Sequence, residues 1–479
     1  MRSDRKPELL CPAGSSEVFK TAVIYGADAV YIGGEAFSLR AKAKNFSIEE
    51  MAECIAFAHE RKVRVYVTAN ILAHNADLKE AKGYFETLKS LGDNRPDALI
   101  ISDPAIFSIA KKVCPEIEIH VSTQANNVNY GTFNFWHELG AKRVVAGREL
   151  SLKEISEIRA NIPDDLEIEA FVHGAMCISY SGRCLLSNFL TGRDANHGEC
   201  THPCRWKYTF SQTSPDDKAV KSQTDTDDHI DEISGTVTEE TRPGELFPVL
   251  ENDRGTFIFN SKDLCMVGHI PDLVAAGIDS FKIEGRMKTA LYIATITKAY
   301  RQAIDDYFED PALYEKNIPL YEKMVRGCTY RQYSTGFFYN KPSEAGQIYD
   351  SSTYEKGREY LGTVREVDYI SDEPLTTEET KSVSIDIMDE TDQAFTDAGM
   401  KVKKADMCRV LITQKNKFCV GDEIEILKVK GKDERVKVLK IETTDGIEQD
   451  SAPHASQDLW ITLDKPAGEY DILCREVQS

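Results

Sequence analysis

ELLCPAGSSEVFKTAVIYGADAVYIGG, residues 8–34, contains the pattern that decides the fold. Two short apolar runs, ELLCP (8–12) and AVYIGG (29–34), flank a stretch with helical spacing, SSEVFKTAVIYG (15–26). A strand, a helix and a second strand in this order form a βαβ unit with parallel strands. The alternation continues to about residue 290, with further strand candidates RVYVTAN (64–70), ALIISD (98–103), IEIHVSTQ (117–124), RVVAGRE (143–149), IEAFVHG (168–174), TFIFNSKD (256–263) and SFKIEGR (280–286).

Eight or nine βαβ strands within about 280 residues fit a (β/α)8-type barrel of mostly parallel strands better than an open sheet. One of the nine candidates must then be an extra strand, and the pattern does not identify it. The barrel domain is predicted over residues 1–305, followed by a helical and extended linker (306–340). Short strands with Gly, Asp and Asn turns predict a small all-β, barrel-like domain over 341–479.

Residues 212–245 interrupt the pattern, with ten acidic residues against three Lys or Arg and few large apolar ones. Such a composition buries too little apolar surface to offset the entropy of ordering the chain. We therefore predict an acidic, mobile insertion within the barrel domain.

The whole-chain totals describe an ordinary globular protein of 479 residues, 41% hydrophobic and 29% charged. The first residues lack the apolar core of a signal peptide, and no run is long enough to span a membrane. These features predict a cytoplasmic protein with reduced thiols and no membrane partner. The net charge of −21 argues against indiscriminate nucleic-acid binding, although a local basic patch remains compatible with it.

Four of the twelve cysteines lie close together, in the spacing Cys177-x6-Cys184-x15-Cys200-x3-Cys204, and Cys265 follows the insertion. Thiolates bind zinc or iron–sulfur clusters, and four of them close either kind of site. The wide spacings favour an iron–sulfur cluster over zinc, and a catalytic thiol or buried structural thiols are the remaining alternatives.

The motifs ELLCPAG, AVYIGG, HGAMCISYSGRCLLSNFLTGRDANHGECTHPCRW, NSKDLC and SFKIEGRMK together resemble the collagenase-like peptidase family, whose catalytic type is unassigned. Within that family, the motifs are most similar to the subgroup that hydroxylates tRNA. The resemblance covers residues 7–305, and the β-rich tail resembles the C-terminal domain of the family. It implies an oxygen-independent conversion of the wobble uridine of tRNA to 5-hydroxyuridine, with prephenate as hydroxyl donor. Other family members hydroxylate ribosomal RNA or an aromatic ring.

The resemblance also implies a [4Fe–4S] cluster, whose ligands carry over to Cys177, Cys184, Cys200 and Cys265. Cys204 competes for the fourth position, because a related branch uses both members of this CxxxC pair. The partners implied are tRNA and prephenate, and a paralogue or a second copy of the chain is left open.

Polar residues that follow the predicted strands are candidates for the catalytic groups. Arg148 and Arg286 are suited to pair with the two carboxylates of prephenate, and Lys262 is a third choice. Asp263 and Glu284 are candidate proton carriers, and His173 is a candidate ligand or base. Salt bridges at the barrel rim are the alternative interpretation of these charged residues.

Proteolysis, which the family name suggests, is the alternative activity. The sequence contains neither HExxH nor GxSxG, so the best candidate pair is Cys177 with His173, four residues apart. A cysteine that binds iron is not a free nucleophile, and this favours hydroxylation.

KVKKADMCRVLITQKNK, residues 401–417, carries six basic residues against one acid. It is a candidate RNA-binding patch, with Lys403, Lys404 and Arg409 as the contacting residues; a solvated strand pair with charged outer faces is the alternative.

Overall fold

The computed structural model describes residues 5–38, 45–176, 208–211, 233–239, 246–250, 262–339, 355–370 and 407–477. The chain divides into two compact units, Met1–Glu355 and Lys356–Ser479.

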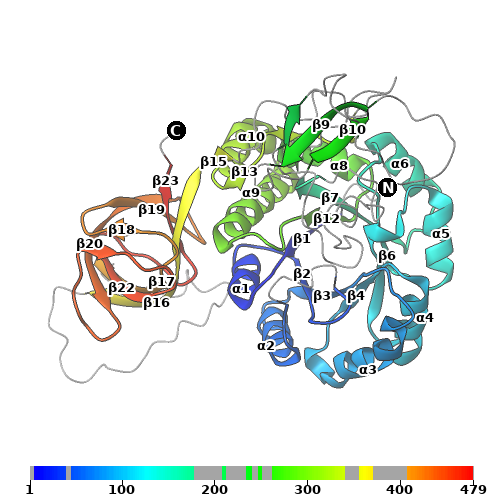
Figure 1. Ribbon diagram of the computed structural model, residues 1–479, viewed down its shortest axis with the longest axis horizontal. Helices are drawn as coiled ribbons and strands as arrows, with labels where there is room; N and C mark the ends of the chain where they lie inside the picture. The colour runs from blue at the N-terminus through cyan, green and yellow to red at the C-terminus, as the bar shows by residue number, and fades with distance from the viewer. Residues whose placement is uncertain are drawn as a thin grey trace. The chain divides into compact units, whose positions relative to one another are not determined.

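The first unit is built on a closed barrel of eight parallel strands, as the sequence predicts (Figure 1). Seven of them pair in chain order, and β12 closes the ring because it pairs with both β7 and β1. The strands are β1 (Glu8–Pro12), β2 (Ala29–Gly33), β3 (Arg64–Ala69), β4 (Ala98–Ile101), β5 (Glu118–Val121), β6 (Arg143–Val145), β7 (Glu167–Gly174) and β12 (Ser280–Ile283). Since all eight are parallel, their carboxyl ends meet at one mouth of the barrel.

Helices connect the barrel strands and cover them from outside (Figure 1). They are α1 (Ser16–Ile24), α2 (Ile48–His59), α3 (Asp77–Ser90), α4 (Pro104–Val113), α5 (Tyr130–Glu138), α6 (Leu152–Ala160) and α8 (Ile270–Ala275), with short 3-10 turns η2 (Gly92–Asn94), η3 (Thr123–Ala125) and η6 (Val267–His269). Side chains cap several helix starts: Ser47 and Ser151 form capping boxes with Glu50 and Glu154, and Asp103 accepts from two backbone amides of α4.

The extra strand is β11 (Asp263–Cys265), which pairs with β7 in the antiparallel sense and lies outside the closed ring. The predicted strand over 256–263 therefore coincides with a described strand only at Asp263; Lys262 precedes β11, and residues 256–261 lie outside the described residues. On the other side of β11 lies the short strand β14 (Tyr333–Ser334).

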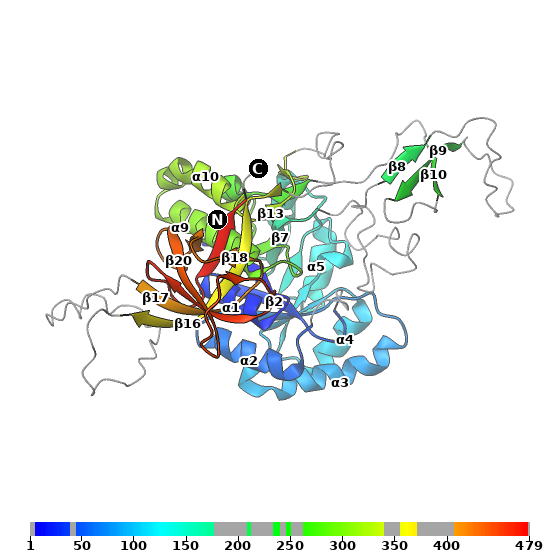
Figure 2. The same ribbon diagram turned by 60° about the vertical axis from the view of Figure 1, so that its left-hand side comes forward.

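The acidic segment 212–245, predicted to be a mobile insertion, contains one described strand. β9 (Ile233–Glu239) pairs antiparallel with β8 (Tyr208–Ser211) and β10 (Leu246–Leu250) in a three-stranded sheet (Figure 2). The sequence of β9 is rich in β-branched residues, and pairing on both sides satisfies its backbone groups. The other residues of this segment lie outside the described part of the chain.

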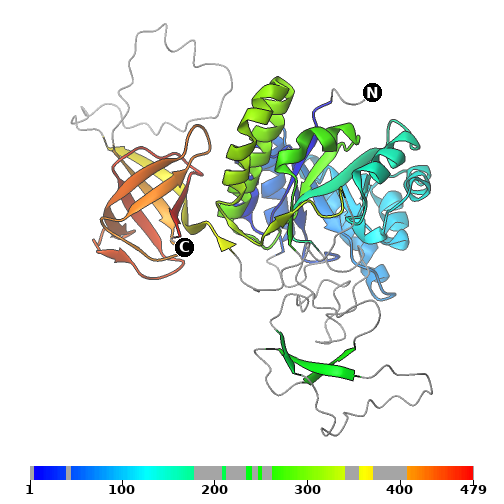
Figure 3. The same cartoon turned by 90° about the horizontal axis from the view of Figure 1, so that it is seen from above.

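Two helices follow the barrel, α9 (Ala290–Glu309) and α10 (Pro311–Val325), and they lie side by side (Figures 1 and 3). The predicted linker 306–340 thus begins in α9 and includes α10, β13 (Thr329–Tyr330) and β14. α9 packs on α1 and β1, so it belongs to the outer layer of the barrel. In the described structure, no helix is both long and apolar enough to cross a membrane.

The second unit is a closed antiparallel barrel in the order β16-β17-β22-β20-β19-β23, coloured yellow to red in Figure 3. Its strands are β16 (Arg358–Ile370), β17 (Met407–Thr413), β19 (Glu423–Leu427), β20 (Glu434–Thr443), β22 (Asp458–Leu463) and β23 (Ile472–Glu476); β18 (Phe418–Cys419) pairs with β21 (Ser451–Ala452), and β15 (Glu355–Lys356) spans the division between the units. Alternate apolar residues of these strands form one buried core, which confirms the predicted small β-barrel.

Arg143, at the start of β6, is the centre of a buried ion-pair network inside the first barrel. Its guanidinium donates to Glu8 at 2.5 Å and to Glu167 at 2.7 Å. It also donates to Glu169 at 3.2 Å, and the other oxygen of Glu169 accepts from Lys282 at 2.6 Å. These side chains come from β1, β6, β7 and β12, so the network ties together the strands on both sides of the closure.

The charge of Arg143 determines the ionisation of Glu8. Burial alone would raise the pKa of Glu8, but the guanidinium and the hydrogen bonds from Arg143, Tyr66 and Ser280 lower this pKa to about 2. Because the pKa of Glu8 is lowered in the folded state, its ionised carboxylate stabilises the fold at pH values above the ordinary pKa of a glutamate. This stabilisation is lost as the pH falls toward 2.

We predict that Arg143→Leu lowers the free energy of unfolding by about 3–5 kcal/mol, because it leaves buried carboxylates without their counter-charge. Urea denaturation followed by helical circular dichroism measures this, since the described helices all belong to the first unit. The control is Lys82→Met, which breaks an exposed pair with Glu86 and costs at most about 0.5 kcal/mol. Equal losses in the two variants would contradict the structural role of the network.

Candidate active site at the barrel mouth

The predicted site residues lie on one arc of the barrel mouth. Arg148 follows β6, His173 is in β7, and both Glu284 and Arg286 follow β12. Asp263 begins β11, the strand added to β7. β6, β7 and β12 are consecutive around the ring. The fold therefore brings together residues that are up to 138 positions apart in the sequence, from Arg148 to Arg286.

Arg286 is buried at the mouth, where neutral oxygen atoms hold its guanidinium. Nη1 donates to Ser38 Oγ at 2.8 Å and to Thr68 Oγ1 at 3.2 Å, and Nη2 donates to Asn45 Oδ1 at 3.2 Å. The guanidinium lies so close to Gly33 that a Cβ there would be 2.1 Å from Nη2. The residues of β2, β3 and the segment after β2 therefore orient this cation.

Arg148 and Glu284 are anchored on either side of β7. Arg148 donates to the carbonyl of Ala175 at 3.3 Å, and its guanidinium lies 4.3 Å from the ring centre of Phe171. The backbone N–H of Glu284 donates to the carbonyl of His173 at 2.8 Å, and the Tyr31 hydroxyl is 3.5 Å from its carboxylate. The guanidinium of Arg148 and the carboxylate of Glu284 thus belong to segments on either side of the carboxyl end of β7.

His173 is enclosed by aromatic side chains. Its ring centre lies 5.5 Å from that of Tyr300, 5.3 Å from that of Tyr333 and 6.1 Å from that of Tyr292. Burial and the nearby charge of Lys288 lower the pKa of His173 to about 3, so the imidazole is neutral near pH 7. Such a weak base is poorly suited to removing a proton from a thiol.

Cys265 lies directly opposite His173 in the pairing of β11 with β7. Side chains at paired positions and at alternate positions share a face, so Cys265, His173 and Asp263 are on the same side of the strand pair. Asp263 is buried and accepts from the backbone N–H of Arg331 at 3.1 Å. Burial raises the pKa of the Cys265 thiol to about 11, so the thiol stays protonated unless a cation or metal compensates.

The position of Cys265 fits a shared metal site with the cysteine motif. β7 ends at Gly174, and Met176, the last described residue before the motif, lies with Leu264 beside Gly336. Cys177, the first cysteine of the motif, follows Met176 directly in the sequence. Cys177, Cys184, Cys200 and Cys204 themselves lie outside the described residues. Cys265 is half-buried, and a thiol whose deprotonation requires compensating positive charge is chemically suited to iron.

The predicted RNA-binding residues are in the second unit. Arg409, in β17, lies with its guanidinium 4.5 Å from the ring centre of Trp460, and its Nε is 3.3 Å from Glu442. Lys403 and Lys404 lie outside the described residues. Lys262, the third candidate cation of the barrel mouth, is half-buried just before β11.

Sequence reasoning missed the partners of these residues. The tyrosines around His173 come from α9 and β14, and Ser38, Thr68 and Asn45 hold Arg286 from β3 and the segment after β2. The only sequence signal for the tyrosines is their frequency in and after α9, a pattern typical of any amphipathic helix.

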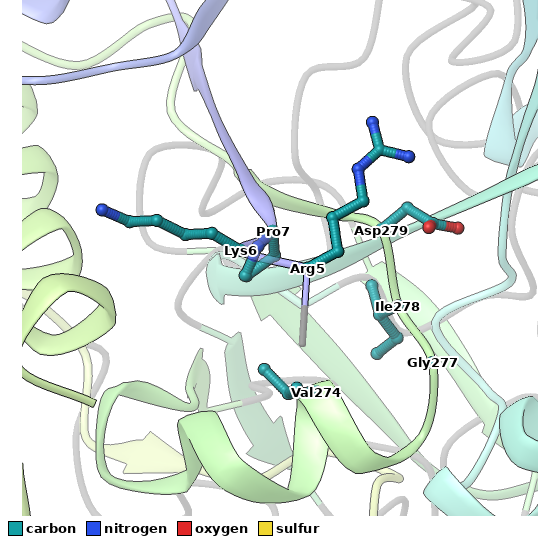
Figure 4. Close-up of a pocket in the computed structure, with 7 residues that line it drawn as sticks. All are labelled: Arg5, Lys6, Pro7, Val274, Gly277, Ile278 and Asp279. Carbon is teal, nitrogen blue, oxygen red and sulfur yellow. The ribbon is translucent and has the colours of Figure 1, made fainter. Parts of the chain in front are cut away.

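A small pocket lies at the other end of the barrel strands. Figure 4 shows its lining residues, which are Arg5, Lys6, Pro7, Val274, Gly277, Ile278 and Asp279. Pro7 and Asp279 directly precede β1 and β12, so this pocket is at the amino ends of the strands. Active sites of (β/α)8 barrels lie at the carboxyl ends, and we therefore place the candidate site at the mouth.

The fold and these residues define a (β/α)8 barrel protein with a cysteine-containing site at its mouth. Residues 14–348 match the model of peptidase family U32, and residues 398–474 match the peptidase family U32 C-terminal domain. The chain belongs to peptidase family U32.

Curated relatives cover most of the chain. It is 36% identical over 461 residues to the tRNA hydroxylation protein P1 of Bacillus subtilis, covering 96% of this chain and 93% of the relative. It is 37% identical over 442 residues to the tRNA hydroxylation protein P of Escherichia coli, covering 89% and 87%. The 23S rRNA 5-hydroxycytidine C2501 synthase of Escherichia coli is 34% identical over 308 residues, which are 64% of this chain and 41% of that one.

We predict that Gly33→Ala destabilises the protein by about 1–3 kcal/mol, because the new methyl group would overlap both Arg286 Nη2 and Ser38 Oγ, which is 2.4 Å from the Cβ position. Thermal unfolding measures this effect. The control is Gly83→Ala in α3, where no atom lies within 4 Å; it is expected to stabilise the helix by about 0.5–1 kcal/mol. An unchanged melting temperature for Gly33→Ala would mean that Arg286 is not held in this position.

Proposed function

We propose that this chain hydroxylates RNA, and specifically that it converts the wobble uridine of tRNA to 5-hydroxyuridine without dioxygen. The observation that carries the proposal is its similarity, over nearly its whole length, to proteins named for tRNA hydroxylation. A more distant relative is named for the hydroxylation of ribosomal cytidine, which is the same chemistry at C5 of another pyrimidine.

The proposed cofactor is a [4Fe–4S] cluster bound by Cys177, Cys184, Cys200 and Cys265, with Cys204 as the alternative fourth ligand. When bound, the cluster supplies a redox-active centre close to the barrel mouth. The pairing of Cys265 with His173 of β7, the strand that precedes the cysteine motif in the sequence, supports this proposal.

Prephenate is the proposed hydroxyl donor. Exchange of the C5 hydrogen of uridine for the hydroxyl group of the donor balances atoms and electrons without dioxygen. We propose that Arg286 and Arg148 bind the two carboxylates, because a guanidinium pairs with a carboxylate through two parallel hydrogen bonds. Asp263 and Glu284, on the neighbouring strand ends, are the proposed carriers of the proton that leaves C5.

Proteolysis by a Cys177–His173 pair receives little support from the geometry. His173 is enclosed by three tyrosines and is a weak base, so activating a thiol by proton transfer to it is unfavourable. The enclosure of His173 fits a structural or positioning role beside Cys265 better.

The direct test is reconstitution. Purified without air, the chain is expected to contain about four irons and four sulfides and to form 5-hydroxyuridine on undermodified tRNA when prephenate is supplied. Metal analysis and nucleoside mass spectrometry measure the two outcomes. An iron-free chain, or one that cleaves peptides and leaves tRNA unchanged, would contradict the proposal.

Cysteine variants of the same preparation assign the ligands. Cys265→Ser is expected to lose iron and activity together, whereas Cys419→Ser, a half-buried cysteine of the second unit, should retain both. If Cys204→Ser loses iron and Cys265→Ser does not, the fourth ligand is Cys204.

We further propose that the second unit helps to bind tRNA. A half-buried tryptophan with a guanidinium over its ring is a surface on which a nucleic-acid base can stack, and Lys403 and Lys404 would add charge.

Replacing Lys403, Lys404 and Arg409 together by alanine is expected to weaken tRNA binding and its salt dependence without changing the iron content. Filter binding at several salt concentrations measures this. The matched control replaces three exposed residues: Lys430 and Lys432, between β19 and β20, and Arg435, near the start of β20. Equal weakening by both triple variants would mean that only net charge matters.

A further inference from the structure

We propose that Phe171 is a positioning residue for the binding of the anionic hydroxyl donor, because its ring holds the guanidinium of Arg148 in place at the barrel mouth. This inference deepens the proposed function and rests on its assignment of Arg148 to a carboxylate of the donor. It gives a role to an apolar side chain of β7, inside the barrel and outside the set of charged residues at the strand ends.

Phe171 lies on the inner face of β7. It follows Glu169 by two residues, and alternate residues of a strand share a face, so its side chain points toward the buried ion-pair network as that of Glu169 does. In the pairing of β7 with β12 it lies opposite Lys282, another member of the network. The side chain of Phe171 is buried, with 8% of its surface exposed. It therefore lies between the network and the carboxyl ends of the strands.

Two cations contact the ring of Phe171. The guanidinium carbon of Arg148 is 4.3 Å from the ring centre, and the Nζ atom of Lys282 is 5.4 Å from it. Both distances are within the roughly 6 Å over which the negative face of an aromatic ring attracts a cation. This attraction is stronger where water is excluded, as it is around a buried ring. Phe171 therefore stabilises the observed position of the Arg148 guanidinium.

Lys282 is itself fixed, so it gives the ring a defined neighbour. Its Nζ atom donates to Glu169 at 2.6 Å and lies 4.4 Å from the ring centre of Tyr31. Separating two buried opposite charges is unfavourable, and this keeps the ammonium group of Lys282 beside Phe171. The ring of Phe171 thus packs against the ion-pair network on one side of its surroundings and contacts Arg148 at the mouth. Through these contacts the network defines where Arg148 lies.

A ring contact is well suited to an arginine that binds a carboxylate. An aromatic ring stacks on the flat face of a guanidinium, whereas a carboxylate is bound by the N–H groups at its edge. The ring carries no net charge, so it does not neutralise the guanidinium as a carboxylate partner would. A second contact comes from the carbonyl of Ala175, which accepts from Nη1 of Arg148 at 3.3 Å. β7 and the residue after its end therefore determine both the position and the orientation of Arg148.

β12 offers a matched control for Phe171. Phe281 directly precedes Lys282, so its side chain lies on the opposite face of β12, away from the barrel interior. It is completely buried. Phe281→Leu and Phe171→Leu each replace a buried ring by the same smaller side chain, so the two variants are expected to have similar costs in stability. Phe171→Leu alone removes a contact with Arg148.

The experiment measures the affinity of the full chain, purified anaerobically with its iron, for prephenate by titration calorimetry. Phe171→Leu is expected to weaken prephenate binding about 3- to 10-fold, and Phe281→Leu is expected to bind it as the wild-type chain does. Arg148→Met is also expected to weaken binding. In the Arg148→Met background, Phe171→Leu should have no further effect, because the ring acts through the guanidinium.

Fluorinated phenylalanine at position 171 separates the charge distribution of the ring from its packing. Each fluorine withdraws electron density from the face of the ring and changes the volume of the side chain little. The attraction of the ring for a cation therefore falls in steps from the unmodified to the trifluorinated ring. The affinity for prephenate is expected to fall in the same order. This series gives the answer even if Phe171→Leu does not fold.

The outcomes separate this inference from the function on which it rests. Equal prephenate affinities of the wild-type chain and the fluorinated chains would overturn the role of Phe171 and leave the proposed donor intact. Equal weakening by Phe171→Leu and Phe281→Leu, or by Phe171→Leu with and without Arg148, would do the same. A wild-type chain that contains iron and binds no prephenate would instead overturn the proposed donor, and this inference with it.

Discussion

The closure of the barrel depends on the charge of one buried arginine. Arg143 joins Glu8 of β1 to Glu167 and Glu169 of β7, and Lys282 of β12 completes the set. β12 is the strand inserted between β7 and β1, so these ion pairs hold the ring together where its two ends meet. Every candidate catalytic group depends on this closure, because it aligns the carboxyl ends of β6, β7 and β12.

The site is built from two halves that the closed ring holds face to face. Ser38, Thr68 and Asn45, from the β2 and β3 side, orient Arg286. The other half comprises β7, the added strand β11, which places Cys265 opposite His173, and the tyrosines of α9 and β14, whose rings surround His173. A polar, cationic half can bind an anionic donor, whereas a half lined by aromatic rings can shield a metal centre from water.

The barrel was predictable because each βαβ unit has its own local signal. The runs at 8–12, 29–34 and 64–70 match β1, β2 and β3 closely, and the helix over 290–309 has continuous amphipathic spacing. The identity of the extra strand was not predictable, since the run that ends in β11 looks like a barrel strand and only its antiparallel pairing with β7 excludes it from the ring. The strand at 233–239 was missed because its acidic neighbours dominate the composition, while its pairing with β8 and β10 is not local.

The position of the candidate site residues at strand ends was predictable from the sequence. The side chains that contact them were not. Arg148, Glu284 and Arg286 follow apolar runs, which is a local signal for the mouth. That Arg286 contacts Ser38, 248 residues away, and that Tyr300 contacts His173 across 127 residues follow only from the closed ring and its outer helix. Asp103, also at a strand end, caps α4 instead, so position alone does not separate structural from functional carboxylates.

The measurement that tests the central claim most directly is the nucleoside composition of tRNA from cells that lack this gene. With the wild-type chain restored, 5-hydroxyuridine and nucleosides derived from it should return; with Cys265→Ser restored instead, they should remain absent. Unchanged 5-hydroxyuridine in the deletion strain would contradict the account.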